Sequence, residues 1–346
     1  MKNKFNILVV GLGYVGLPLA IELGKKYPVL GYDIDKNRIK KLSLYIDTNN
    51  EFNKNEIKKS KFLQFTHKLT NQFIQNIIIV TLPTPINKKK LPDLSNIKNF
   101  NLKLSPLLKK NDIVIYESTV FPGCTEEIFV PQLESKSTFK LNKGLNIGYS
   151  PERVNPGDKK MNIKNISKII SASNRKTLNV MHQVYQSILK AKVYKAKSIM
   201  IAEAAKVIEN TQRDINISFI NELAIIFDKM NIDTLEVLKM ASTKWNFLNF
   251  LPGLVGGHCI GVDPYYLAYK SKKIGVQPNL ILAGRKINDN MANYIIKKIN
   301  FKIKSNNLNL KNLKILLCGI TFKPNVSDIR NSKALDILAY YHPKVK

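Results

Sequence analysis

Short apolar runs alternate with helix-patterned segments through the first half of the chain. Runs of four or five consecutive apolar residues of this kind are typical of strands buried on both faces of a parallel sheet. The segments between them, around residues 16–25, 95–109 and 123–133, repeat their apolar positions with the period of a helix. This alternation predicts an α/β fold, with a doubly wound, Rossmann-like parallel sheet at the N-terminus. The predicted strands include residues 5–10, 28–35, 62–66, 76–85 and 112–120.

The pattern changes after residue 197. Residues 198–230 contain neither proline nor glycine and predict one long helix, and further helices are predicted at 233–242, 264–275 and 278–304. At KILLCGI, residues 314–320, the pattern returns to strand, loop and helix. We therefore expect three parts: a Rossmann-like domain at 1–197, a central helical domain at 198–304 that joins protomers into a homodimer or larger homo-oligomer, and an incomplete second Rossmann-like unit at 305–346.

Length, charge and cysteine content narrow the class of protein. A chain of 346 residues with a net charge of +30 contains more than one domain, but its lysines are spread along the sequence rather than gathered in a stripe. We expect small acidic ligands rather than a nucleic acid. No apolar run approaches the roughly 20 residues that span a bilayer, so we expect a cytoplasmic protein with no membrane partner. The three cysteines and four histidines lack ligand spacing, so no metal site is expected.

The motif GLGYVG follows the first predicted strand and opens a helix. Gly11, Gly13 and Gly16 have the G-x-G-x-x-G spacing of a dinucleotide site, with Tyr14 and Val15 completing the turn. The glycines allow a tight turn, close approach of a pyrophosphate and close packing of helix on strand. Asp33 ends the second strand, where a carboxylate meets ribose hydroxyls and repels a 2′-phosphate, which favours NAD over NADP. The alternative is a glycine turn with a purely structural use.

Other polar residues follow the carboxyl ends of later predicted strands, the edge at which open α/β sheets bind ligands. Prolines and hydroxyl residues also make ordinary turns, and that remains the alternative here. The candidates are Thr84 and Pro85 in TLPTP, Ser118 and Thr119 in ESTVFPG, and Glu152 and Arg153 in YSPERV.

Two features of the second half suggest chemistry. Cys259 stands in GGHCIGVDPYY, where the neighbouring glycines leave room for another molecule to reach its sulfur. The alternative is a small buried cysteine in a glycine turn. On the long helix, Lys206 and Asn210 are four positions apart and project from one face among apolar neighbours, where an ammonium and an amide can bind a developing alkoxide. The alternative is a solvated helix face.

These segments together resemble the UDP-glucose/GDP-mannose dehydrogenase family from residue 1 to about 338. Within it they are most similar to UDP-N-acetylhexosamine 6-dehydrogenases of capsule, Vi-antigen and O-antigen synthesis. The segments that carry the resemblance are, in order, GLGYVGLPLA, YDID, LPTP, ESTVFPG, YSPERVNPG, AEAAKVIENTQRDINISFINELA, GGHCIGVDPYYLAYK and GITFKPNVSDIRNS.

The resemblance implies oxidation of the C6 alcohol of a UDP-sugar to a carboxylate with two NAD+. It implies that Cys259 forms a thiohemiacetal and then a thioester, which water hydrolyses. It also implies that Lys206 and Asn210 stabilise the oxyanion and bind substrate, and that Asp263 positions or activates water and the alcohol. Glu152 and Thr119 would assist hydrolysis. The remaining implied contacts are with the substrate, by Glu152, Arg153, Phe250, Gly253 and Lys323, and with the cofactor, by Arg330.

Family members continue for several dozen residues past SDIRNS, so the resemblance implies an incomplete C-terminal domain. It leaves open a UDP-glucose 6-dehydrogenase and a truncated NAD-binding relic that does not turn over. A simple hydroxyacid dehydrogenase fits less well, because it has no use for Cys259.

Overall fold

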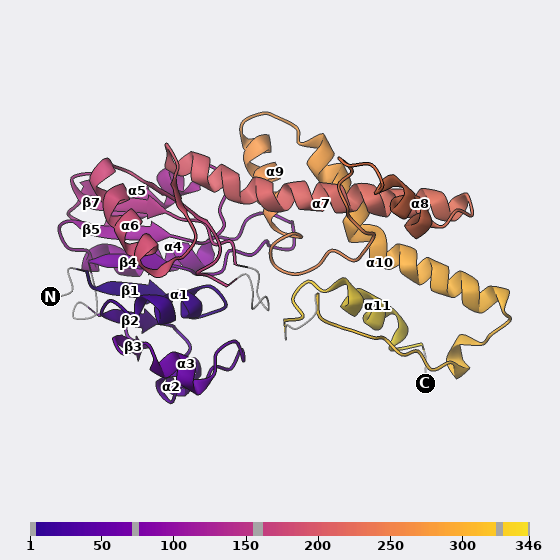
Figure 1. The fold of residues 1–346 in the computed structure, drawn as a ribbon, viewed down its shortest axis with the longest axis horizontal. Helices are drawn as coiled ribbons and strands as arrows, with labels where there is room; N and C mark the ends of the chain where they lie inside the picture. The colour runs from indigo at the N-terminus through magenta and orange to yellow at the C-terminus, as the bar shows by residue number, and fades with distance from the viewer. Residues whose placement is uncertain (1–4, 71–75, 155–161, 323–327, 345–346) are drawn as a thin grey trace. The chain divides into compact units, whose positions relative to one another are not determined.

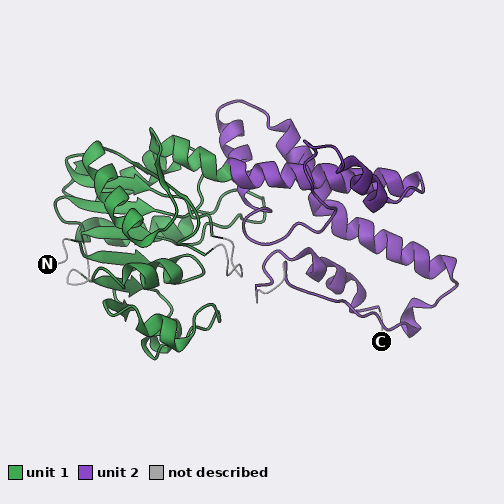
Figure 2. Cartoon of the chain, in the orientation of Figure 1, with its two compact units in different colours: residues 1–207 green, residues 208–346 purple. Residues whose placement is uncertain are grey.

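A computed structural model describes residues 5–70, 76–154, 162–322 and 328–344. The chain divides into two compact units, unit 1 comprising residues 1–207 and unit 2 comprising residues 208–346 (Figure 2). Each unit is described by itself below. None of the described helices is both long and apolar enough to cross a bilayer.

Unit 1 is built on one large twisted sheet (Figure 1). Its strand order is β3-β2-β1-β4-β5-β7-β8-β9, with β6 paired to β7. The order runs outward in both directions from β1, so the predicted doubly wound α/β fold is confirmed. The strands are β1 (Ile7–Val10), β2 (Val29–Tyr32), β3 (Leu63–Thr66), β4 (Ile77–Val80), β5 (Asp112–Tyr116), β6 (Lys140–Leu141), β7 (Gly144–Tyr149), β8 (Lys168–Ala172) and β9 (Val193–Lys195).

The pairing is parallel throughout except between β7 and β8, which run antiparallel. The central strands β1 and β4 are buried along their whole length, which explains their unbroken apolar sequences. Side chains of α1 and α6 join those of β1 and β4 in one core. The helices of unit 1 are α1 (Gly16–Leu23), α2 (Lys36–Ser43), α3 (Lys54–Lys58), α4 (Ser95–Leu104), η2 (Ser105–Leu107), η3 (Thr125–Phe129), α5 (Val130–Ser135) and α6 (Arg175–Ile188).

Unit 2 is helical in its described part. The long helix α7 (Ile199–Lys229) begins in unit 1 and continues into unit 2. The predicted helices of this region are all present, with ends shifted by one or two residues. They are α8 (Thr234–Ala241), α9 (Asp263–Lys273) and α10 (Asn279–Ser305), followed by η4 (Leu310–Asn312) and α11 (Lys333–Tyr341).

The segment from residue 314 to 320 differs from expectation. No strand forms there in the described part of the chain, and Leu316 is 87% exposed. A strand needs a hydrogen-bonded neighbour, and no described segment of unit 2 provides one. The following helix does form, and Ile337 and Tyr341 of α11 pack on Ala292 and Ile296 of α10. The division into three parts at residues 197 and 304 stays a prediction.

Candidate active site

The glycine turn between β1 and α1 has a different requirement at each glycine. Gly11 has φ +88°, a conformation that side chains rarely adopt. A Cβ on Gly16 would lie 1.8 Å from the carbonyl oxygen of Gly11, so Gly16 lets α1 approach the strand. A Cβ on Gly13 would meet nothing within 4 Å, and no side chain caps the start of α1. The free space at Gly13 and the uncapped N–H groups fit the pyrophosphate of a dinucleotide.

Asp33 is fixed beside this turn. Its Oδ2 accepts a hydrogen bond from the Leu12 N–H at 2.8 Å, and its Oδ1 accepts one from the Asp35 N–H at 3.0 Å. Arg38 lies nearby, donating from Nε to the Leu12 carbonyl at 2.6 Å and pairing with Asp47 at 3.2 Å. The local geometry supports Asp33 as the ribose ligand, and that role stays a prediction.

The predicted hydroxyl residues after β4 and β5 come together. The Thr84 hydroxyl donates to the Thr119 carbonyl at 2.7 Å, and the Ser118 hydroxyl donates to the Leu82 carbonyl at 2.6 Å. The Pro85 carbonyl accepts the Asp93 N–H at 2.8 Å and orders the same loop. These bonds join two loops at the carboxyl edge of the sheet, where a cofactor is expected.

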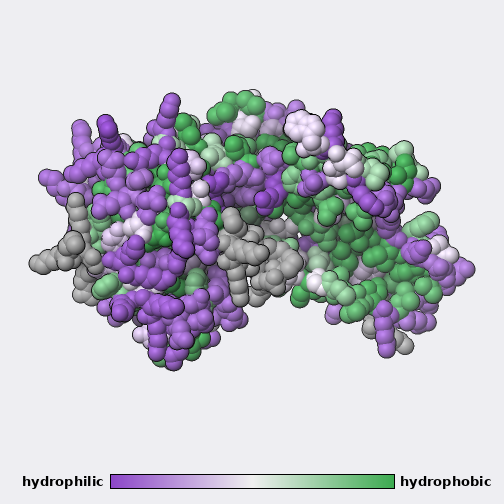
Figure 3. Space-filling model, in the orientation of Figure 1, coloured by the Kyte–Doolittle hydropathy of each residue, from purple (hydrophilic) through white to green (hydrophobic). Residues whose placement is uncertain are grey.

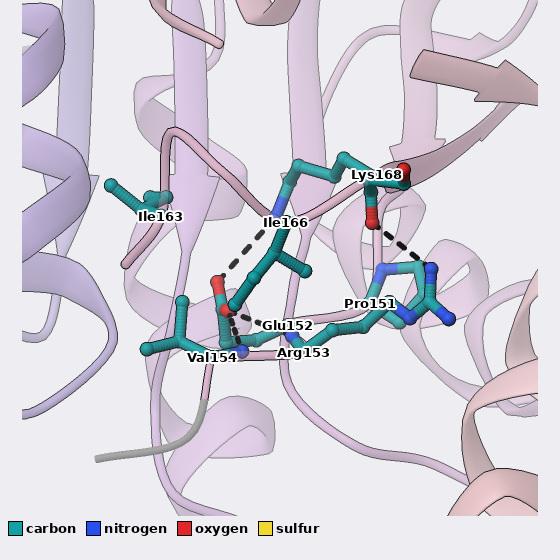
Figure 4. Close-up of a pocket in the computed structure, with 8 residues that line it drawn as sticks. Pro151, Glu152, Arg153, Val154, Ile163, Ile166 and Lys168 are labelled. Carbon is teal, nitrogen blue, oxygen red and sulfur yellow. Dashed lines mark hydrogen bonds and ion pairs between the residues drawn. The ribbon is translucent and has the colours of Figure 1, made fainter. Parts of the chain in front are cut away.

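Glu152 belongs to a buried ionic cluster, here called the Lys168 cluster, which consists of Glu117, Glu152, Lys168 and Tyr185. The Lys168 ammonium lies 2.8 Å from Glu117 Oε2 and 3.5 Å from Glu152 Oε2. The Tyr185 hydroxyl donates to Glu117 Oε1 at 2.5 Å. Glu152 Oε1 accepts the backbone N–H groups of the next two residues (Figure 4). Burial raises the pKa of Glu117 to about 7, with Lys168 acting in the opposite direction.

Three members of this cluster were not among the predicted site residues. Glu117 precedes the predicted Ser118, while Lys168 and Tyr185 come from a strand and a helix further along the chain. A glutamate at the end of an apolar strand was an available signal for Glu117. No local signal marks Lys168 or Tyr185. The Arg153 guanidinium, a predicted substrate contact, donates to the Ser167 carbonyl at 2.9 Å beside the cluster.

Cys259 lies in a turn that leads directly into α9. Its carbonyl accepts the N–H groups of Val262 at 3.0 Å and Asp263 at 2.9 Å, and the residue is partly exposed. Asp263 is the first residue of α9 and is buried. The Asn210 amide donates to Asp263 Oδ2 at 2.6 Å. The structure thus joins Cys259, Asp263 and Asn210 within unit 2.

The glycines before Cys259 lie against another part of unit 2. A Cβ on Gly256 would lie 2.7 Å from the Asn331 carbonyl oxygen, and one on Gly257 would lie 2.8 Å from the Phe322 ring. Gly257 also has φ +81°. The glycines therefore make room for Phe322 and Asn331, and the expectation that they also admit a ligand to the sulfur stays a prediction.

Arg330, next to Asn331, is held in place by Asp328. Its guanidinium forms hydrogen bonds with Asp328 at 2.5 and 2.9 Å, and Asp328 lies 3.2 Å from His258 Nδ1. Burial acts to raise the pKa of Asp328, but the hydrogen bonds from Arg330 lower it below its usual value. The predicted cofactor contact of Arg330 stays a prediction, and the predicted substrate contact Lys323 lies outside the described residues.

A buried polar network holds the loop that precedes Cys259. Asn221 of α7 donates to the Gly253 carbonyl at 3.0 Å and accepts the Gly253 N–H at 2.8 Å. Asn221 also donates to Asn288 at 2.8 Å, which links this loop to α10. Phe250, the other predicted pocket residue, is half-buried in the same loop.

Arg285 of α10 is the centre of a second buried group. It lies 2.6 Å from Asp214 of α7 and 2.5 Å from Asp289, and the Tyr265 hydroxyl of α9 donates to Asp289 at 2.9 Å. Arg285 thus ties together α7, α9 and α10, and it was not among the predicted site residues. An arginine in a lysine-rich chain was its only signal in the sequence.

The predicted catalytic residues are divided between the two units. Thr119, Glu152 and the buried Lys206 lie in unit 1, and Asn210, Cys259 and Asp263 lie in unit 2. Within the described ranges, no group of three or more His, Cys, Asp or Glu side chains is arranged to hold a metal ion.

Comparison with known proteins gives matches along almost the whole chain. Residues 5–189 match the NAD binding domain, and residues 200–290 the central domain, of the UDP-glucose/GDP-mannose dehydrogenase family. The chain is 50% identical over 336 residues to UDP-N-acetyl-D-glucosamine 6-dehydrogenase of Salmonella typhi, covering 97% of this chain and 79% of the relative. It is 50% identical to the enzyme of the same name from Pseudomonas aeruginosa, covering 100% of this chain and 82% of the relative.

Solved structures agree with these matches. The structure of UDP-D-ManNAc dehydrogenase from Pyrococcus horikoshii has a TM-score of 0.90 at 29% identity, covering 99% of this chain and 82% of that one. The UDP-N-acetyl-mannosamine dehydrogenase Cap5O from Staphylococcus aureus has a TM-score of 0.85 at 30% identity, covering 99% and 81%.

Proposed function

Because the chain belongs to the UDP-glucose/GDP-mannose dehydrogenase family and carries its NAD binding domain, we propose that it oxidises C6 of a UDP-N-acetylhexosamine to the uronic acid. The substrate is UDP-GlcNAc or UDP-GalNAc, and the product serves surface polysaccharide synthesis. The chain is 50% identical to two UDP-N-acetyl-D-glucosamine 6-dehydrogenases, which supports an N-acetylhexosamine as the sugar of the substrate. The observation that carries the proposal is the Cys259 turn, with Asp263 buried at its end and bonded to Asn210.

Each catalytic residue has a proposed role in the reaction. The Cys259 thiol adds to the C6 aldehyde: the S–C6 bond forms, the π electron pair of the carbonyl goes to its oxygen, and that oxygen takes up the proton of the thiol, while Lys206 and Asn210 stabilise the negative charge that develops on it. NAD+ held at the glycine turn of unit 1 would supply the hydride acceptor for each of two oxidations, so two molecules would be consumed per sugar. In hydrolysis the water oxygen bonds to C6, the C6–S bond breaks with its electron pair going to Cys259, and Glu152 takes the proton of the water.

The residues present fit the dinucleotide. Gly13 leaves open space at the start of α1, where the uncapped N–H groups bind phosphate oxygens. Asp33 would bind the ribose hydroxyls, and Thr84, Pro85, Ser118 and Thr119 line the neighbouring strand ends.

The proposal is tested by replacing the nucleophile. Cys259→Ser is expected to abolish formation of the uronic acid from UDP-GlcNAc and UDP-GalNAc while NAD binding is retained, because serine at this position is a much weaker nucleophile than a thiolate. Cys318→Ser is the matched control, since Cys318 is exposed and in the same unit. NADH absorbance and product mass are measured for both UDP-N-acetylhexosamines and for UDP-glucose.

The outcomes separate the alternatives. Turnover of UDP-glucose but neither N-acetylhexosamine would make the chain a UDP-glucose 6-dehydrogenase. NAD binding without turnover of any UDP-sugar would make it an inactive relic. Normal acid formation by Cys259→Ser would refute the thioester route.

We also infer that the chain forms a homodimer through its central helices. Large apolar side chains are exposed at Phe219 and Ile226 of α7 and at Met230 directly after it, with exposed fractions of 55%, 44% and 57%. Phe219 and Ile226 are seven positions apart and therefore lie on one helix face. Leu235 and Met240 extend exposed apolar surface onto α8, and Figure 3 shows apolar side chains gathered over unit 2. Contiguous exposed surface of this kind is typical of a protein interface.

A further inference from the structure

Glu152 accepts hydrogen bonds at one oxygen and faces the Lys168 ammonium with the other. Its Oε1 accepts the N–H groups of Arg153 at 2.7 Å and Val154 at 2.5 Å, which fixes the orientation of the carboxylate. Its Oε2 is buried and has no hydrogen-bond partner among the described residues. Glu152 and Lys168 both line a small pocket with room for about one water molecule (Figure 4). Oε2, which lies 3.5 Å from the Lys168 ammonium, therefore still has room to accept a hydrogen bond from a water.

Lys168 occupies a position that a lysine rarely tolerates. It is the first residue of β8, and its side chain is only 5% exposed. A buried ammonium costs several kcal/mol unless nearby carboxylates compensate it. Three ionisable groups face it in the described part of unit 1, each from a different element: Glu117 after β5, Glu152 after β7 and Tyr185 of α6.

The charges of these groups determine what Lys168 does. Two carboxylates share one ammonium, so the fully ionised cluster carries one excess negative charge. Burial raises the pKa of Glu117 to about 7, which makes Glu117 the member that takes up a proton near neutral pH. Burial alone would lower the pKa of Lys168, but Glu117 and Glu152 raise it, so Lys168 stays charged. With Glu117 protonated, the ammonium is left to Glu152.

We propose that Lys168 is a positioning residue for thioester hydrolysis, which holds the Glu152 side chain with Oε2 directed to a water, while Glu117 and Tyr185 hold Lys168 in place. This inference rests on the proposed function, in which Glu152 takes the proton of the hydrolytic water. It assigns a purpose to three buried residues that the proposed chemistry does not otherwise use. Lys168 itself touches no reacting atom.

The test variant is Lys168→Met, with Lys164→Met as matched control. Lys164 is partly exposed, and its ammonium lies 3.1 Å from Glu22 Oε2, away from the Lys168 cluster. Without the ammonium, the cluster keeps two buried carboxylates with no positive charge between them, so the cluster as a whole binds a proton more readily. Lys168→Met is expected to lower kcat about tenfold to a hundredfold and to move the acid limb of the kcat–pH profile upward by about one pH unit. Lys164→Met is expected to match the wild type.

A second readout identifies the step. If hydrolysis is slowed, the thioester accumulates on Cys259, so intact mass spectrometry during turnover shows the acyl adduct in Lys168→Met but not in the wild type. Lys168→Arg, which keeps the charge, is expected to recover part of the rate. If Lys168→Met fails to fold, the double variant Glu117→Gln/Lys168→Met removes the unpaired charge and is expected to fold and to accumulate the same adduct.

Failure of this inference can be distinguished from failure of the proposed function. Absence of NADH production by the wild type overturns the proposed function and this inference with it. Wild-type turnover together with an unshifted pH profile and no adduct in the folded Lys168 variants overturns the inference alone. A uniform loss of rate at every pH with a lowered melting temperature assigns Lys168 a purely structural role and also overturns it.

Discussion

Gly13 and Gly16 stand three residues apart in one turn, yet replacing each with alanine is expected to damage a different property. At Gly16 the new Cβ would lie 1.8 Å from the backbone oxygen of Gly11 and 2.4 Å from the Thr81 hydroxyl. Helix α1 must then move away from the turn by roughly 1 Å or more. At Gly13 the new Cβ would meet nothing within 4 Å, and the backbone of Gly13 is not among the described left-handed positions.

The magnitudes follow from these distances. Overpacking costs typically about 1–3 kcal/mol, and a clash between backbone and Cβ that no side chain can relieve belongs at the upper end, about 3 kcal/mol. For a unit of this size, each kcal/mol lowers the melting temperature by about 2–4 °C, so Gly16→Ala is expected to lose about 6–12 °C. Gly13→Ala is expected to melt no lower than the wild type. Its methyl group, however, fills space that the pyrophosphate needs, so NAD affinity falls at least about tenfold.

Calorimetric melting without cofactor and titration with NAD measure the two properties separately. The reasoning predicts opposite profiles: a stability loss for Gly16→Ala, and an affinity loss at unchanged stability for Gly13→Ala. Wild-type NAD affinity in Gly13→Ala would refute the assignment of the open space to the cofactor. Wild-type melting of Gly16→Ala would show that the turn is not packed as described.

Three further predictions follow from other groups. Asp33→Asn keeps an acceptor for the Leu12 N–H but removes the negative charge that would repel a 2′-phosphate. In steady-state kinetics, the ratio of kcat/KM for NADP to that for NAD is expected to rise at least about tenfold. An unchanged ratio would contradict the role of Asp33 in selecting NAD. Burial raises the pKa of Glu203 from 4.5 to about 7, so the folded state binds this proton more tightly than the unfolded state, and the free energy of unfolding falls by about 3 kcal/mol as pH rises through that window. Denaturant melts at several pH values are expected to show a smaller decrease for Glu203→Gln than for the wild type. An equal decrease would exclude Glu203 as the cause of the pH dependence. The double variant Phe219→Glu/Ile226→Glu is expected to be monomeric by light scattering, and a persistent dimer would place the interface elsewhere.

Local signals in the sequence were sufficient for the sheet and the glycine turn. The spacing of Gly11, Gly13 and Gly16 and the position of Asp33 depend on a few neighbouring residues, and the structure places Asp33 beside the turn as this pattern requires. Strands buried on both faces are apolar throughout, so the positions of β1, β4 and β5 were predictable. Their relative direction was not, and the antiparallel pairing of β7 with β8 has no signature in periodicity.

Other features depend on contacts between distant residues and could not be predicted. Lys168 meets Glu117 across 51 positions and Tyr185 meets it across 68, and nothing local in the sequence marks Lys168 or Tyr185. The run at 314–320 has the composition of a strand, but a strand forms only when a neighbour pairs with it. Composition therefore predicted an element that tertiary context does not support.

The Cys259 turn shows how the last part of the chain contributes to the candidate active site. A side chain at Gly256 or Gly257 would clash with Asn331 or Phe322, which occupy the space beside them. The Asn331 amide also donates to the Gly257 carbonyl at 3.0 Å. On the other side, the turn is continuous with α9 through the N–H of Asp263. Phe322 and Asn331 thus form a wall of the Cys259 turn within unit 2. Residues after 305 therefore shape the surroundings of Cys259 directly, although the described part of this region forms no sheet of its own.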